Sequence, residues 1–532
     1  MKKLPAPPIL GQLAVAALLA ALSGCSTLPT TERLPENRDS CDCDLQNDSL
    51  GQLLEYALDE PESSHATHSL AHFVERWHAQ PGATTGGMVS IGDRRYEVKF
   101  GNGHSRYSLD YFDVISPAID YEIKRLDHHR MDGVGAPLVA LRENTGRAPI
   151  EDFYPPEAIT RPLTAVITRG ELASGPGVQT VQVDLLCPLM QNTAVVNGQA
   201  RPLAVDLSVP WAKLLERARE LKRTKLQDFS KREKRLGPQL YLMEPYDPNK
   251  EPLIMIHGLL STPLVWAEIS NTLWADDAIR SRYQIWHFLY DTSAPALYSS
   301  RILREKLREV RPMLDPEGDD PAMRSTTIIA HSMGGIVTRG LLTRPGDAFW
   351  DAAFTRPFDS LELSEADRGA LQEAFFWDSA PHIKRVIYIA ASHRGSDVAD
   401  NVVGRLGRLL AKPDRQFQEF YARISGANPG AFTEDYARLG EGKLDSIHAL
   451  SPKQPTLKIL AELPNHHQVR EFSIIGDRGR PGPLDRSSDG TVEYWSSHID
   501  RAESEKVIPA DHFGVLEHES SLAEVKRILK LP

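Results

Sequence analysis

Residues 326–334 read Thr-Thr-Ile-Ile-Ala-His-Ser-Met-Gly, and this stretch decides the expected fold. Its apolar first half predicts a buried strand, and the residues after Gly334 are compatible with a helix. A strand that turns this sharply into a helix needs small residues on both sides of the turn, and Ala330 and Gly334 are small. Such a turn would lift the Ser332 hydroxyl clear of the sheet and point a helix N-terminus at it. The stretch predicts a candidate nucleophile; the alternative is an ordinary turn with an exposed serine.

An upstream motif supports the first interpretation. Leu253–Leu259 has the pattern of a buried strand that ends in His257-Gly258. A glycine at this point lets the loop turn so that the Leu259 amide can face a reacting carbonyl. Together with the amide of Met333, it would form an oxyanion hole.

Two downstream segments complete the pattern. Phe472–Gly476 is a short apolar strand, and the polar loop after it contains Ser-Asp-Gly-Thr-Val, with Asp489 as its acid. Val507-Ile508 then leads to Asp-His-Phe-Gly, which holds His512, and to a helix expected from about Ser520 to Leu529. Nucleophile, acid and histidine follow one another in the chain order of one known class of hydrolase.

With these motifs, the chain from roughly residue 238 to 532 resembles α/β-hydrolases of the bacterial lipase and esterase type. The segment Ala391–Ser396, Ala-Ser-His-Arg-Gly-Ser, is similar to the Thr-Pro-His-Arg-Gly-Ser of lipases and of GPI inositol-deacylase-like hydrolases. The resemblance implies an α/β fold with a doubly wound, mostly parallel sheet and helical cap insertions. It also implies ester chemistry without a cofactor or a metal.

The chemistry assigns a role to each side chain. An unassisted serine is a poor nucleophile at neutral pH, so His512 would accept the proton of Ser332 and return it to the leaving group. A carboxylate would hold the imidazole in the right tautomer. We expect Asp489 in this role because its Asp-Gly-x-Val context matches the lipase acid. Asp477, nearer the end of the preceding strand, is the alternative acid, and either one could be a turn residue.

The other histidines are weaker candidates for the base. His512 is preferred because an apolar stretch ends just before it and a helix begins just after it. The competitors are His498 and His518. Three further histidines are expected to be structural, near the oxyanion loop, the serine turn and the Arg-Gly-Ser loop: His257, His331 and His393.

The N-terminus resembles a bacterial lipoprotein signal. Met1–Lys3 is positively charged, Leu13–Leu22 is apolar but too short for a membrane span, and small residues precede Cys25. This predicts an exported protein that is lipidated on Cys25 and anchored in the cell envelope. Ser26 at the next position implies the outer membrane, if the cell has one. The alternative is a plain secretory signal.

Cysteine usage and charge narrow the possible partners. Besides Cys25 the chain has Cys41, Cys43 and Cys187, and a bridge from Cys41 or Cys43 to Cys187 is expected in an oxidising compartment. Metal binding by the Cys-x-Cys pair is the weaker alternative. The net charge of −11 makes nucleic acid an unsuitable partner. The expected partners are an ester or lipid substrate and, through the lipid anchor, a membrane.

The chain of 532 residues is too long for one hydrolase unit. We expect a signal peptide at 1–24, a polar tether at 25–50, an accessory region at 51–237 and the hydrolase domain at 238–532. The accessory region is predicted to be mostly helical up to about residue 158, including a helix over Tyr111–Leu126. Strands are predicted at Thr164–Thr168, Gln179–Leu186 and Leu203–Val209, either as a separate β-unit or as an extension of the hydrolase sheet.

Two insertions, at about 344–382 and 400–465, interrupt the expected hydrolase domain. The second carries amphipathic helical patterns and lies where this fold commonly places a cap. The first is rich in aromatic residues, which either are buried against the core or line an acyl-binding cleft and its lid. These residues are Phe349, Trp350, Phe354, Phe358, Phe375, Phe376 and Trp377.

The leading hypothesis is therefore an anchored serine hydrolase that cleaves carboxylic esters with an apolar part. An acyltransferase would use the same three residues while excluding water, and sequence does not separate the two. A non-catalytic envelope protein that keeps the fold as a binding or scaffold module is the third possibility. Peptidase or amidase activity is less consistent with the lipase-like motifs.

Overall fold

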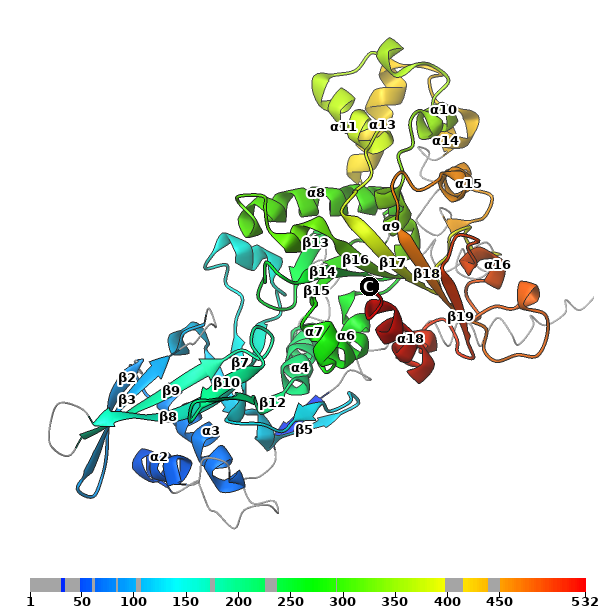
Figure 1. Ribbon diagram of the computed structural model, residues 1–532. Helices are drawn as coiled ribbons and strands as arrows, with labels where there is room; N and C mark the ends of the chain where they lie inside the picture. Colours follow the sequence, from blue (N-terminus) through cyan, green and yellow to red (C-terminus); the bar gives the residue numbers. More distant parts are fainter. Residues whose placement is uncertain are drawn as a thin grey trace, which may run out of the picture.

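The computed structural model describes residues 30–33, 48–59, 63–82, 85–101, 107–172, 178–224, 237–292, 294–397, 415–438 and 450–532. Cys25, Cys41 and Cys43, and with them the predicted lipidation and disulfide, lie outside these ranges. Two large sheets organise the described chain (Figure 1). Among the described residues, no helix is both long and apolar enough to cross a membrane.

The C-terminal sheet has seven strands in the order β13-β15-β14-β16-β17-β18-β19. Only β13 runs antiparallel to its neighbour β15, and every other pairing is parallel. The central strands read as continuous apolar runs because both faces of a parallel sheet are covered. The strands are Gln239–Leu242 (β13), Glu251–Ile256 (β14), Tyr283–Leu289 (β15), Thr326–His331 (β16), Ile383–Ile389 (β17), Arg470–Gly476 (β18) and Ser504–Ile508 (β19).

Helices cover both faces of this sheet (Figure 1). Ile254 and Ile256 of β14 belong to one core, together with side chains from α8 (Ala296–Leu314) and α9 (Gly334–Leu342). Leu253 and Met255 of the same strand belong to the opposite core, with α6 (Ala267–Trp274) and α18 (Glu519–Leu529). Successive side chains of a strand point to opposite faces, so each central strand contributes to two cores.

The N-terminal region contains its own six-stranded sheet, in the order β2-β3-β9-β8-β7-β4. It is therefore a separate β-unit and does not extend the C-terminal sheet. Helices α2 (Leu50–Asp59) and α3 (Ser64–His78) pack against it. The strands are Gly86–Ile91 (β2), Arg94–Gly101 (β3), Val114–Pro117 (β4), Ala136–Arg142 (β7), Ile159–Leu172 (β8) and Val178–Leu186 (β9).

Two predictions for this region are wrong. The expected helix over Tyr111–Leu126 is instead β4, a single 3-10 turn (Ala118–Asp120) and β5 (Tyr121–Lys124). Pro117 cannot donate a backbone hydrogen bond inside a helix, and the β-branched residues before it favour an extended chain. The region is mostly strand from residue 86 onward, because these segments pair with partners far away in the sequence.

A third prediction is correct only in part. Of the strand expected over Leu203–Val209, only Val205–Asp206 (β12) is extended, and α4 (Ser208–Thr224) begins directly after it. The carboxylate of Asp206 accepts hydrogen bonds from the amides of Ser208 and Val209, at 3.1 and 3.0 Å. A carboxylate in this position satisfies amides that have no partner within the first turn of the helix, so it starts the helix here. Helix α4 lies between the two sheets (Figure 1).

The aromatic residues of the first insertion pack mainly against one another. Trp350 and Phe354 stack at 3.9 Å between ring centroids, and Phe375 meets both rings edge-on. Ile424 of α13 (Arg415–Ala427), from the second insertion, completes this cluster. Figure 1 shows α10 (Ala348–Ala353), α11 (Glu365–Phe375), α13 and α14 (Glu434–Arg438) as one helical group.

The position of this helical group follows from chain direction. The first insertion leaves the end of α9 and returns at the start of β17, where the Ala380 amide donates to Leu341 O at 2.8 Å. It therefore begins and ends at the edge where the parallel strands start. Ser332 lies at the opposite edge, where β16 ends. Of the two interpretations of the aromatic residues, the structure favours burial in a packed cluster.

Candidate active site

Ser332 occupies a strained turn between β16 and α9. Its φ is +55°, in the left-handed region that residues other than glycine rarely adopt. A Cβ on Gly334 would lie 2.3 Å from the carbonyl oxygen of Ile256, so only glycine fits there. The central strands of the sheet thus force the tight turn that the sequence predicted, and the turn brings Ser332 to the edge of the sheet.

The structure brings Ser332, His512 and Asp489 together, although about 180 residues separate the serine from the histidine. The Nε2 of His512 lies 3.0 Å from the Ser332 Oγ, and its Nδ1 lies 2.7 Å from the Asp489 Oδ2. An ionised carboxylate can only accept a hydrogen bond, so the Nδ1 carries the proton. The Nε2 is then free to accept the hydrogen of the serine hydroxyl.

The loop of residues 488–492 holds Asp489 as a carboxylate. Its Oδ1 accepts hydrogen bonds from the amides of Thr491 at 2.8 Å and Val492 at 2.7 Å. Burial alone would raise the pKa of Asp489. The charge and hydrogen bond of His512, with the two amides, outweigh burial and hold this pKa below its ordinary value. Both oxygens of the carboxylate therefore have fixed partners.

Asp477, the alternative acid, is engaged elsewhere. It is partly exposed, and its Oδ1 accepts a hydrogen bond from the Gly479 amide at 2.8 Å. Gly479 has a φ of +61°. This is the geometry of a turn residue that bonds to the backbone two positions later.

Two histidines beside the site are buried and neutral. Burial lowers the pKa of His257 to about 4, and burial together with the charge of His512 lowers that of His331 to about 3. The Nε2–H of neutral His331 donates to the carbonyl oxygen of His512 at 2.9 Å. His331 thus positions the backbone of the candidate base. His393 is buried against Tyr388, edge to face, with 4.4 Å between the ring centroids.

The competing histidines are far less suited to act as the base. His498 is partly exposed and lies 2.6 Å from the Glu505 carboxylate, which raises its pKa. His518 caps α18, where its Nδ1 accepts the Ser520 amide at 3.1 Å. Neither has a described contact with Ser332.

The loop after β14 lies directly against the serine. A Cβ on Gly258 would lie 2.7 Å from the Ser332 Cβ, so glycine permits this approach. Within the described residues, neither the Leu259 amide nor the Met333 amide donates a hydrogen bond to a protein acceptor. The two amides predicted to form the oxyanion hole therefore have no protein acceptor in the part of the chain that the structure describes.

The Arg-Gly-Ser segment has a role that the sequence did not reveal. The Arg394 guanidinium donates to the carbonyl oxygens of Trp495 at 2.8 Å and His498 at 2.6 Å. The hydroxyl of Ser396 donates to Thr491 O at 2.5 Å. Ser396 therefore braces the loop that carries Asp489, and Arg394 holds the helix that follows this loop, α16 (Tyr494–Ser497). The similarity of 391–396 to lipase segments was the available signal, but it does not indicate which backbone groups are held.

Three described groups have the spacing of metal ligands, and none includes a residue of this site: His72 with Glu75 and Asp120, Asp127 with His129 and Glu268, and Asp315 with Asp319 and Asp320. In the first group, Arg33 lies between the two carboxylates, 2.9 Å from Glu75 and 3.0 Å from Asp120.

The arrangement of the site can perform acyl transfer. It combines a strained serine, a histidine able to accept its proton and a buried carboxylate hydrogen-bonded to the other ring nitrogen of that histidine. Ser332 is 6% exposed and His512 is 5% exposed. Water is thus largely excluded around the reacting atoms, which strengthens each electrostatic interaction.

No family model and no curated protein matches this chain. Solved structures with partial similarity include a lipase of Bacillus licheniformis in its mature form, at 17% identity and a TM-score of 0.29, covering 55% of this chain and 98% of that chain. A metagenomic carboxyl esterase has 16% identity and a TM-score of 0.31, covering 53% and 76%.

A third is a structure from Nitrososphaera gargenis, in a study of carboxylesterases, at 15% identity and a TM-score of 0.28, covering 55% of this chain and 93% of that chain. By name, these three structures are those of a lipase, of a carboxyl esterase and of a protein from a study of carboxylesterases. At these TM-scores the similarity carries no argument about function, which depends on the site itself.

Proposed function

We propose that this protein is a serine hydrolase of the α/β-hydrolase fold that cleaves carboxylic esters. The observation that carries the proposal is the continuous chain of hydrogen bonds from the Ser332 hydroxyl through His512 to Asp489. The strained turn at the serine and the seven-stranded sheet support it. The resemblance of the motifs to bacterial lipases and esterases favours esters over amides.

In the first half of the reaction, the Ser332 Oγ attacks the ester carbonyl carbon while the His512 Nε2 takes its proton. The carbonyl oxygen becomes an oxyanion, which the amides of Leu259 and Met333 stabilise. Asp489 stabilises the imidazolium that has formed. The C–O bond to the alcohol then breaks, and His512 gives its proton to the departing alkoxide. The products of this half are an alcohol and an acyl-serine.

In the second half, His512 takes a proton from water, and the resulting hydroxide attacks the acyl carbon. The bond to Ser332 breaks, and the serine oxygen recovers the proton from His512. A carboxylic acid is released and the enzyme is restored. An acyltransferase would accept an alcohol in place of water at this step, so product analysis with a competing alcohol distinguishes the two activities.

The test uses a fluorophosphonate probe and p-nitrophenyl esters of graded chain length. The wild type should be labelled and should hydrolyse the esters, whereas Ser332→Ala should do neither and should keep its melting temperature within a few degrees. Ser392→Ala is a matched control, because Ser392 is also a buried serine near this edge of the sheet. Labelling of the Ser332→Ala variant at the wild-type rate would contradict the proposal.

We also propose that the protein is exported and anchored to the cell envelope through lipid on Cys25. The lipoprotein-like segment before Cys25 supports this part. Several acyl chains would give lasting attachment, where a single chain would not. Mass spectrometry of the mature N-terminus is the test. An unmodified terminus that starts at another residue would contradict the anchor without affecting the catalytic proposal.

A further inference from the structure

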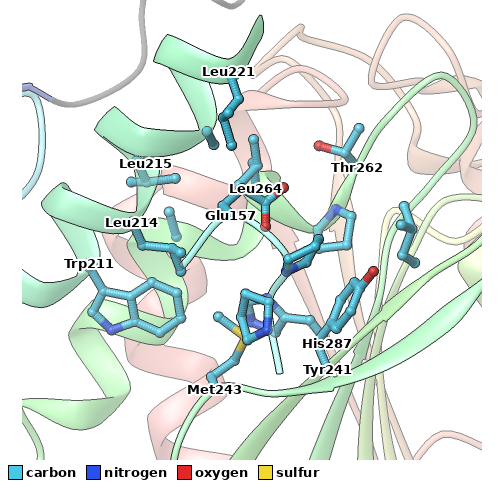
Figure 2. Close-up of a pocket in the computed structure, with 16 residues that line it drawn as sticks. Glu157, Trp211, Leu214, Leu215, Leu221, Tyr241, Met243, Thr262, Leu264 and His287 are labelled. Atoms are coloured by element: carbon cyan, nitrogen blue, oxygen red, sulfur yellow. The ribbon is translucent and has the colours of Figure 1, made fainter. Parts of the chain in front are cut away.

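A second feature lies between the two sheets, where α4 faces the edge strands of the C-terminal sheet. It is a small pocket with a cavity volume of about 70 Å³, and it is partly open to solvent (Figure 2). The accessory region and the proposed hydrolase domain both contribute walls, so neither unit forms this pocket alone. We call it the interunit pocket.

The walls of the interunit pocket are mainly apolar. Leu214 and Leu215 of α4 form one side, and Tyr241 and Met243 on and beside β13 form another (Figure 2). These side chains are all buried. Such walls favour a hydrocarbon over water, because moving apolar surface out of water is favourable.

The few polar residues of the pocket do not change this character. His287 is buried, and its Nε2 lies 3.0 Å from the Ser270 hydroxyl. Burial lowers the pKa of His287 to about 3, so it is neutral at physiological pH. Glu157 and Thr262 are only partly buried.

The pocket lies close to the proposed active site. Thr262, Pro263 and Leu264 line it, and Thr262 is four residues after Gly258, where a Cβ would lie 2.7 Å from the Ser332 Cβ. Four residues of extended chain span at most about 14 Å. Leu289, another lining residue, is the last residue of β15, at the same edge as Ser332.

The sheet order gives a second measure of this distance. β15 is two positions from β16, and β13 is three positions away. At about 4.8 Å per strand, these separations are about 10 and 14 Å. A group attached to the reacting carbonyl would need to extend over this distance to enter the pocket, which an acetyl group cannot do and a long alkyl chain can.

We propose that the interunit pocket binds the hydrocarbon chain of the ester substrate. That the bound chain belongs to an ester substrate rests on the proposed function. That the pocket binds a hydrocarbon chain does not. Each methylene that the pocket buries should raise kcat/KM about fourfold. The accessory region would then be part of the substrate site, and it would direct the enzyme toward esters with long apolar chains.

The test compares two helix substitutions that each place a carboxylate at a partly exposed apolar residue. Leu221→Glu changes the rim of the interunit pocket. Met313→Glu changes α8 at a residue that is 44% exposed and does not line the pocket. The ratio of kcat/KM for the decanoate to the acetate p-nitrophenyl ester should fall at least tenfold in Leu221→Glu and stay within twofold of wild type in Met313→Glu.

A binding measurement without turnover separates this inference from the catalytic proposal. cis-Parinaric acid, a fluorescent fatty acid, should bind the full-length Ser332→Ala protein, and adding Leu221→Glu should weaken this binding at least tenfold. If no variant hydrolyses any ester, but parinarate still binds and Leu221→Glu weakens it, the catalytic proposal fails and the pocket proposal stands. If Leu221→Glu and Met313→Glu bind parinarate as Ser332→Ala alone does, or if the chain-length ratio does not move, the pocket proposal is overturned.

Discussion

Replacing Asp489 by asparagine tests the proposed mechanism at one atom. The side chain keeps its size, but one oxygen becomes an NH₂ group. The Oδ1 of Asp489 accepts two amides, at 2.8 and 2.7 Å, and the Oδ2 accepts the Nδ1–H of His512 at 2.7 Å. Asparagine has only one accepting oxygen, so it can satisfy one of these two sides but not both.

The amides of Thr491 and Val492 decide the orientation of the asparagine side chain in Asp489→Asn. If the NH₂ group faced Thr491 and Val492, two buried amide donors would lose their acceptor, at about 1–3 kcal/mol each. The NH₂ group should therefore face His512, where it can only donate. The imidazole must then carry its proton on Nε2, which faces the Ser332 Oγ and can no longer accept the serine proton. A wrong tautomer of this kind lowers kcat by about 10⁴, or about 5.4 kcal/mol in the barrier.

The assay is steady-state hydrolysis of p-nitrophenyl acetate, with the rate of fluorophosphonate labelling as a second measure. Asp477→Asn is the matched control, and its kcat should stay within about twofold of wild type because, among the described residues, the Asp477 carboxylate bonds to the Gly479 amide and not to His512. The reasoning is refuted if Asp489→Asn keeps more than a tenth of the wild-type kcat, or if Asp477→Asn loses more activity than Asp489→Asn.

Three further outcomes are expected. Gly334→Ala should abolish esterase activity and lower the melting temperature, because its Cβ would lie 2.3 Å from Ile256 O; normal activity on p-nitrophenyl acetate would show that the turn tolerates a side chain. Trp350→Ala should lower the free energy of unfolding by about 3–5 kcal/mol without changing the chain-length profile of the remaining activity, because this ring is buried in the aromatic cluster. Chemical denaturation measures the loss of stability, and ester kinetics on the same preparation measure the profile. A changed profile would support the acyl-cleft interpretation instead. The folded-state pKa of Asp489 is below its ordinary value, so the contribution of this carboxylate to stability is present above the ordinary pKa and is lost as the pH falls from about 5 toward 3. Wild type should therefore lose more stability than Asp489→Asn over this range. Equal losses in urea titrations would contradict the assigned pKa direction.

The sequence predicted the elements whose signals are local. The turn at Ser332 was predictable because a strand, two small residues and a helix pattern lie within a few positions of one another. Gly258 and Asp489 were predictable in the same way, since each lies in a short motif at the end of a strand. The chain order of the motifs then indicated that the three side chains meet, and the hydrogen bonds agree with that expectation.

Other predictions failed or stayed open where the structure of a segment depends on contacts with segments far away in the sequence. Residues 111–126 lack a helix because β4 pairs with β7, which starts more than 20 residues later. The aromatic residues of the first insertion could have lined a cleft or filled a core, and the structure packs them mainly against one another, with Ile424 of α13 beside them.

The sequence by itself thus predicted a candidate nucleophile, a candidate base and a preferred candidate acid, because backbone sterics and side-chain chemistry act over a few residues. Only the tertiary structure decided what surrounds them. It placed His512 in contact with Asp489 and not with Asp477, and it showed the Ser396 hydroxyl bonded to the loop that carries Asp489. It also brought α4 against β13 to form the interunit pocket. Such contacts join segments far apart in the chain, and their energies depend on burial and packing that no local pattern specifies.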